Sequence, residues 1–134
     1  MSETPEARQP ALIVDDNEGM GFVIQCMLEL MDFTVERARD GLEALTMSSA
    51  KPYSVILMDI EMPVMDGLSA TRAIRSHEAT DHISPVKIIG ITGHRDGGTR
   101  RLCQLAGMDD VLCKPFLMGQ LQQTLARPQT TPIN

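Results

Sequence analysis

Acidic side chains follow two apolar segments of the sequence, at positions that suit the binding of a metal ion and a phosphate. Residues 55–58 lead into Asp59, and residues 11–14 lead into Asp15 and Asp16. Both segments are short and almost continuously apolar, which indicates strands buried on both faces of a parallel sheet. Open α/β sheets bind ligands at the carboxyl ends of their strands, so we expect these three carboxylates to share one edge.

Two further segments end on side chains that could contact a phosphate. Thr92 follows the apolar stretch 86–91, and Lys114 follows 111–113. Crowded carboxylates raise one another's pKa unless a cation lies among them, and Mg²⁺ prefers oxygen ligands of this kind. A carboxylate that faces a metal-bound phosphate can act as a nucleophile and form an acyl phosphate. An ammonium and a hydroxyl would stabilise the charge on the phosphoryl oxygens.

The intervening sequence predicts how these side chains are positioned. Apolar strands alternate with amphipathic helices, which favours a single α/β domain with a doubly wound, five-stranded parallel sheet and five helices. The domain is predicted to cover residues 11–126, with flexible tails at 1–10 and 127–134. Asn17 can cap the first helix, Gly107 can end the fourth, and the third should fade into a polar loop at 77–85. The fourth helix, predicted over 95–106, begins weakly because of Gly97 and Gly98.

Composition narrows the classes of function. The chain has 134 residues, 43% of them hydrophobic, and ten methionines, enough for one adaptable aliphatic core. A net charge of −6 argues against binding of nucleic acid or an anionic membrane. Three widely spaced cysteines without a C-x-x-C pair favour a reduced, cytoplasmic protein.

In their order along the chain, these motifs resemble those of response-regulator receiver domains of two-component signalling. The motifs are Val14-Asp15-Asp16-Asn17, Asp59-Ile60-Glu61-Met62-Pro63-Val64-Met65-Asp66-Gly67, Thr92, and Ala106-Gly107-Met108-Asp109 through Lys114-Pro115. Single motifs of this kind are weak evidence, but together they are specific. The resemblance implies a flavodoxin-like strand order 2-1-3-4-5, with a switch function controlled by phosphorylation. It also implies a cis peptide between Lys114 and Pro115.

The resemblance further implies the role of each site residue. Asp59 would accept a phosphoryl group from a phosphohistidine, while Lys114 and Thr92 would contact that group. Asp16, Asp59 and the backbone carbonyl of Glu61 would bind Mg²⁺, with Asp15 helping through a water molecule. The implied partners are a histidine kinase or a histidine phosphotransfer domain, and the chain itself would be a monomer or weak dimer. It would catalyse only its own phosphorylation and dephosphorylation.

Several residues have simpler interpretations or depart from the family pattern. Asp15 and Asp16 alone could cap a helix, and Asp66-Gly67 is interpreted as a turn. Among the histidines, His77 and His82 are interpreted as ordinary loop residues, and His94 as a residue overhanging the site. Val111 replaces the usual aromatic ring, and Gly93 stands where a small residue is usual. We therefore predict that output comes from the segment 94–98 rather than from residue 111.

Two other classes of function stay open at this point. Asp59-Ile60-Glu61 superficially matches the D-x-D motif of haloacid-dehalogenase-type phosphatases, although its second acid is Glu and no cap segment is evident. A receiver-like module that binds partners without phosphorylation is the other alternative. No DNA-binding or catalytic domain is expected after Leu125, so the chain is either a stand-alone regulator or a receiver from a hybrid histidine kinase.

Overall fold

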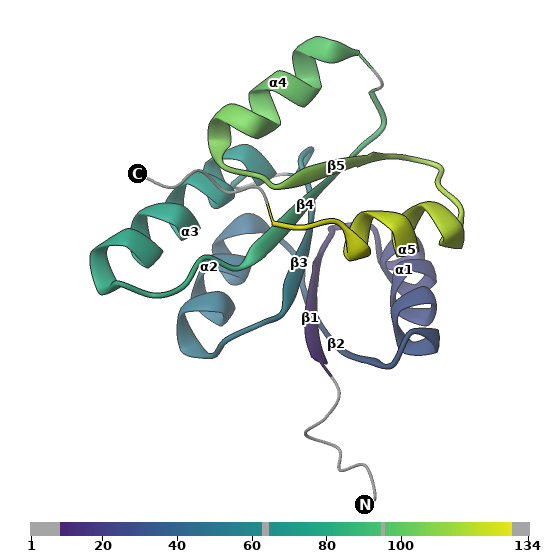
Figure 1. Cartoon of the computed structure of the whole chain (residues 1–134), viewed down its shortest axis with the longest axis horizontal. Helices are drawn as coiled ribbons and strands as arrows, with labels where there is room; N and C mark the ends of the chain where they lie inside the picture. Colours follow the sequence, from purple (N-terminus) through teal and green to yellow (C-terminus); the bar gives the residue numbers. More distant parts are fainter. Residues whose placement is uncertain (1–8, 63–64, 95, 130–134) are drawn as a thin grey trace, which may run out of the picture.

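The computed structural model describes residues 9–62, 65–94 and 96–129. Strands and helices alternate along this part of the chain in ten elements (Figure 1). In order they are β1 (Gln9–Val14), α1 (Glu18–Leu30), β2 (Phe33–Ala38), α2 (Gly41–Ala50), β3 (Val55–Asp59), α3 (Gly67–Asp81), β4 (Lys87–Thr92), α4 (Gly97–Ala106), β5 (Asp110–Cys113) and α5 (Met118–Ala126).

The five strands form one parallel sheet in the order β2-β1-β3-β4-β5. The structure confirms the doubly wound parallel sheet predicted from the sequence pattern and the flavodoxin-like strand order that the resemblance to receiver domains implied. Strand β3 lies at the centre, and all five of its residues are buried. Its continuous apolar sequence is explained by this position, because helices cover both of its faces.

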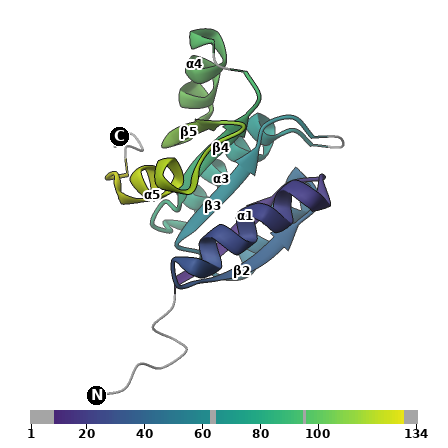
Figure 2. The same cartoon turned by 90° about the vertical axis from the view of Figure 1, so that its right-hand side faces the viewer.

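The helices lie in two layers, one on each face of the sheet (Figures 1 and 2). One layer is formed by α1 and α5, whose Ile24, Leu28 and Leu121 pack on the side chains of one sheet face. The other is formed by α2, α3 and α4, which contribute Ala44, Ile74 and Cys103 to a second core. Each strand thus sends alternate side chains into two different cores.

Several boundaries differ from the sequence prediction. Strand β1 begins at Gln9 rather than at residue 11, since Gln9 and Pro10 pair with Phe33 and Thr34. Pro10 has no N–H to donate, but its carbonyl accepts a hydrogen bond from the Ser54 N–H at 2.8 Å.

Helix α3 continues through the predicted loop to Asp81. The reason is Glu78, a buried carboxylate that accepts from the Val86 N–H at 2.8 Å and pairs with Arg75 at 2.8 Å. These contacts hold the last turns of the helix against the start of β4. His77 therefore lies on a helix, and His82 ends it in the left-handed conformation. Sequence periodicity could not reveal this, because the contact of Glu78 with Val86 is set by the tertiary fold.

Residues 127–129, which the sequence assigned to a flexible C-terminal tail, contact the domain or receive hydrogen bonds from it. The Arg127 guanidinium contacts Asp110 at 2.7 Å, and the Gln129 side chain donates to the Pro85 carbonyl at 2.8 Å. Lys87 Nζ donates to three main-chain carbonyls at the end of α5, those of Thr124, Leu125 and Arg127. These contacts fix the chain as far as Gln129. The predicted tail segments 1–8 and 130–134 lie outside the described residues.

Two smaller expectations concern cysteines and membranes. Cys26, Cys103 and Cys113 are all free thiols, as predicted. Across residues 9–62, 65–94 and 96–129, no helix combines the length and the apolar character that crossing a bilayer requires.

Candidate functional site

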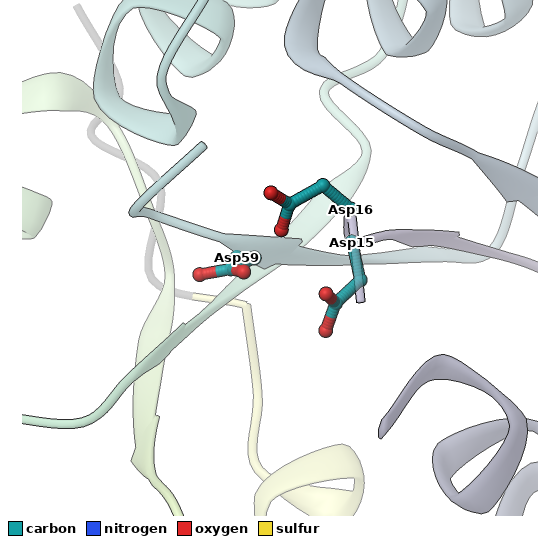
Figure 3. A group of neighbouring side chains, drawn as sticks. All are labelled: Asp15, Asp16 and Asp59. Atoms are coloured by element: carbon teal, nitrogen blue, oxygen red, sulfur yellow. The ribbon is translucent and has the colours of Figure 1, made fainter. Parts of the chain in front are cut away.

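Three carboxylates meet at the carboxyl edge of the sheet, as the sequence predicted. Asp15 and Asp16 follow β1, and Asp59 ends the neighbouring strand β3. One oxygen from each of the three side chains lies within 4.8 Å of the others, and Figure 3 shows them around a common space. Asp15 and Asp59 are buried, whereas Asp16 is exposed. This donor set, made only of carboxylate oxygens, fits a hard divalent cation.

Backbone N–H groups orient two of these carboxylates. Asp15 Oδ1 accepts from the Asn17 N–H at 2.7 Å, and Asp59 Oδ1 accepts from the Glu61 N–H at 3.0 Å. Asn17 itself caps α1 by accepting from the Met20 N–H. The simpler interpretation of Asp15 and Asp16 as helix caps is therefore wrong, since Asn17 has that role.

A glycine allows the start of α3 to lie close to Asp59. A Cβ atom on Gly67 would lie 2.4 Å from the Asp59 carbonyl oxygen, closer than any side chain can approach. Its neighbour Asp66 caps α3 and accepts from the Ser69 N–H, so it is a helix cap where the sequence predicted a turn residue. Pro63 and Val64 of the same motif lie outside the described residues.

The electrostatic surroundings of Asp59 disfavour its charge. Burial raises the pKa of Asp59 from 3.8 to about 6, and the negative charges of Asp15 and Asp16 act in the same direction. The hydrogen bond from Glu61 and the charge of Lys114 oppose this rise in pKa. A cation placed among the three carboxylates would reverse the repulsion.

Thr92 is the last residue of β4, and Lys114 directly follows β5. Lys114 Nζ is 3.9 Å from Asp59 Oδ2 and partly exposed, which leaves it able to contact an incoming anion as well. Thr92 is fully buried at the end of β4, and its Oγ1 accepts from the His94 N–H at 3.0 Å. The Lys114–Pro115 peptide is cis, as predicted.

The Glu61 side chain is not part of the acid cluster. Its carboxylate contacts His94 Nε2 at 2.5 Å, with both side chains more than half exposed. Asp59 and Glu61 therefore do not form the paired carboxylates of a D-x-D phosphatase. This contact joins the exposed His94 ring to the loop that follows Asp59. The partner of His94 could not be foreseen, because the two residues lie on different loops.

The structure shows the environment of the two residues that depart from the family pattern, Val111 and Gly93. Val111 is 6% exposed and packs in the core beneath α3 and α4. A Cβ on Gly93 would meet no atom within 4 Å, so the space beside Thr92 is open. A side chain larger than that of glycine would therefore fit at position 93.

A parallel doubly wound sheet with three acids, a threonine and a lysine at its carboxyl edge defines a class of phosphate-handling switch domains. Residues 11–126 match the response regulator receiver domain family, and the chain belongs to that family. It is 37% identical over 126 residues to the sensor histidine kinase GacS of Pseudomonas protegens. That alignment covers 93% of this chain but only 14% of the kinase.

Solved structures agree with this assignment. The receiver domain of the sensor histidine kinase PA1611 from Pseudomonas aeruginosa is 40% identical, with a TM-score of 0.79 over 89% of this chain and 95% of that one. That domain holds a magnesium ion in its active site cleft. A chain in the complex of the phosphotransfer protein Ypd1 with the Ssk1 receiver domain, from Saccharomyces cerevisiae, is 26% identical, with a TM-score of 0.83. This match covers 88% of our chain and 86% of that chain.

Proposed function

We propose that Asp59 is the phosphoryl acceptor of this receiver domain, and that its phosphorylation switches the binding of a partner. The observation that carries the proposal is the position of the Asp59 carboxylate. It is buried at the end of the central strand, grouped with Asp15 and Asp16, and 3.9 Å from the Lys114 ammonium.

The reaction requires in-line attack by a carboxylate oxygen. An oxygen of Asp59 would bond to the phosphorus of a phosphohistidine as the N–P bond breaks, and the imidazole leaves with that electron pair and takes up a proton. Lys114 would contact the transferred oxygens, and the Thr92 hydroxyl would turn towards them. Both groups act on charge that is already present in the phosphoryl group, so positioning supplies most of the catalysis.

Mg²⁺ is the proposed cofactor. Asp16, Asp59 and the Glu61 carbonyl would hold it, with Asp15 helping through water. When bound, the ion would offset the negative charge of the carboxylates and the phosphoryl oxygens. Asp16→Ala should weaken Mg²⁺ binding at least about tenfold, because a ligand or an oriented partner of a ligand is lost. Unchanged Mg²⁺ affinity in this variant would show that the metal site lies elsewhere.

The proposed partner is a histidine kinase or a histidine phosphotransfer domain. One exposed apolar side chain lies beside the site: Phe22, which lines the same hollow as Asp15 and Asp16, is 60% exposed. Leu117, three residues after Lys114 in the sequence, is 74% exposed. Apolar side chains beside a charged site suit docking of another protein. A cytoplasmic location, a monomeric or weakly dimeric state, and the absence of catalysis beyond self-phosphorylation stay predictions.

Intact-mass analysis tests the central proposal. Incubation with a small-molecule phosphodonor and Mg²⁺ should give one labile phosphoryl adduct on the native chain. Asp59→Asn should abolish the adduct, because an amide has nearly the same shape but is not nucleophilic. Asp32→Asn, which changes an exposed acid beyond the C-terminal end of α1, is the matched control and should retain it. An undiminished adduct in Asp59→Asn would contradict the assignment.

A further inference from the structure

The loop between β4 and α4 is attached to its neighbours through His94. The His94 N–H donates to Thr92 Oγ1 at 3.0 Å, and its ring contacts Glu61 at 2.5 Å. Its carbonyl accepts a hydrogen bond from the Cys113 thiol, with Sγ 3.2 Å from the oxygen. On either side of it, a Cβ placed on Gly93 or Gly97 would meet no atom within 4 Å. Among the described residues of this loop, His94 thus has three contacts that join it to neighbouring segments.

Cys113 is the last residue of β5, directly before Lys114 and beside Thr92 at the end of β4. It pairs with Thr92 across β4 and β5, and the next residue, Lys114, donates its N–H to the Thr92 carbonyl at 2.7 Å. The thiol adds a side-chain contact at the same place. It joins β5 to the loop that begins directly after Thr92.

Phosphorylation of Asp59, as proposed above, would disturb one of the three His94 contacts directly. If Thr92 turns towards the phosphoryl group, its Oγ1 moves away from the His94 N–H. The loop can follow only if the His94 carbonyl also leaves the Cys113 thiol. A contact that is made only in the unphosphorylated arrangement favours that arrangement over the phosphorylated one by the free energy of the contact.

We propose that Cys113 is a positioning residue whose thiol, by holding the His94 carbonyl, keeps the β4–α4 loop in its unphosphorylated arrangement. The inference rests on the proposed function of Asp59. Removal of the thiol should favour the phosphorylated arrangement and tighten the binding of a phosphoryl mimic. A thiol is a weak donor, so the expected change in apparent affinity is about two- to fivefold.

Titration with beryllofluoride in the presence of Mg²⁺ tests this inference on the full chain. Cys113→Ala should bind about two- to fivefold more tightly than the native protein. Without ligand, it should also show faster hydrogen exchange at residues 93–98. Cys113→Ser keeps a donor at the position and should restore both values. Cys26→Ala, which removes a thiol on α1, is the matched control and should behave as the native protein.

The outcomes separate this inference from the proposed function. Equal or weaker beryllofluoride binding by Cys113→Ala, with a normal native protein, overturns the role of Cys113 alone. The same holds if the Ser and Ala variants behave alike, because the effect would then come from packing rather than from a hydrogen bond. Failure of the native protein to bind beryllofluoride overturns the proposed function, and this inference with it.

Discussion

Replacement of Asp59 by asparagine should stabilise the metal-free protein at neutral and alkaline pH. Burial and the neighbouring acids raise the pKa of Asp59 from 3.8 to about 6. The folded state therefore binds this proton more tightly than the unfolded chain. Between these two pKa values the folded protein carries more protons, so its stability falls as the pH rises. The amide of the Asp59→Asn variant would carry no charge at any pH and would escape this penalty.

The size of the effect follows from the shift in pKa. About two pKa units correspond to an upper limit of about 3 kcal/mol. The site is open to water on the side of Asp16, and solvent screens the charges, so we expect about 1–2 kcal/mol above pH 7. That corresponds to a rise of about 3–8 °C in Tm for a domain of this size. The gain should shrink as the pH falls through 6 and vanish below about pH 4, where Asp59 is neutral in both states.

Urea unfolding at several pH values, without metal, measures this difference. The exposed acid variant Asp32→Asn serves as the control and should show no comparable trend with pH. Added Mg²⁺ should narrow the gap, because the native protein gains a ligand-binding free energy that the variant lacks. A stability gain that is the same at pH 4 and pH 8, or no gain at pH 8, would refute the electrostatic reasoning.

Two further predictions concern the remainder of the fold. Arg75→Met should lower the free energy of unfolding, measured in urea, by about 3–5 kcal/mol. The reason is that the buried carboxylates of Glu78 and Asp109 lose the guanidinium that pairs with them. A loss below about 1 kcal/mol would show that these charges are solvated. Hydrogen exchange with and without beryllofluoride should change most at residues 93–102, since the Val111 side chain is short and stiff. Strong change at 111–116 with none at 93–102 would contradict this mode of output.

The sequence by itself determined the order of elements and the identity of the acidic edge. Apolar runs that end in Asp15, Asp59 or Thr92 predict strand ends, and the alternation with helices predicts that those ends share an edge. The parallel sheet and the grouping of Asp15, Asp16 and Asp59 followed correctly from these patterns, whereas the strand order was implied by the resemblance to receiver domains. These predictions were correct because hydrophobic periodicity and chain direction are local properties that can be read directly from the sequence.

Only the tertiary structure decided the contacts between residues distant in sequence. Arg75 meets Asp109 across 34 positions of the chain, and the Cys113 thiol meets the His94 carbonyl across 19. The extent of α3 likewise depends on Glu78 meeting the start of β4. The raised pKa of Asp59 depends on how deeply the packed sheet and its loops bury one carboxylate. Burial and side-chain partners arise from the packing of whole elements, and no local pattern of residue types encodes them.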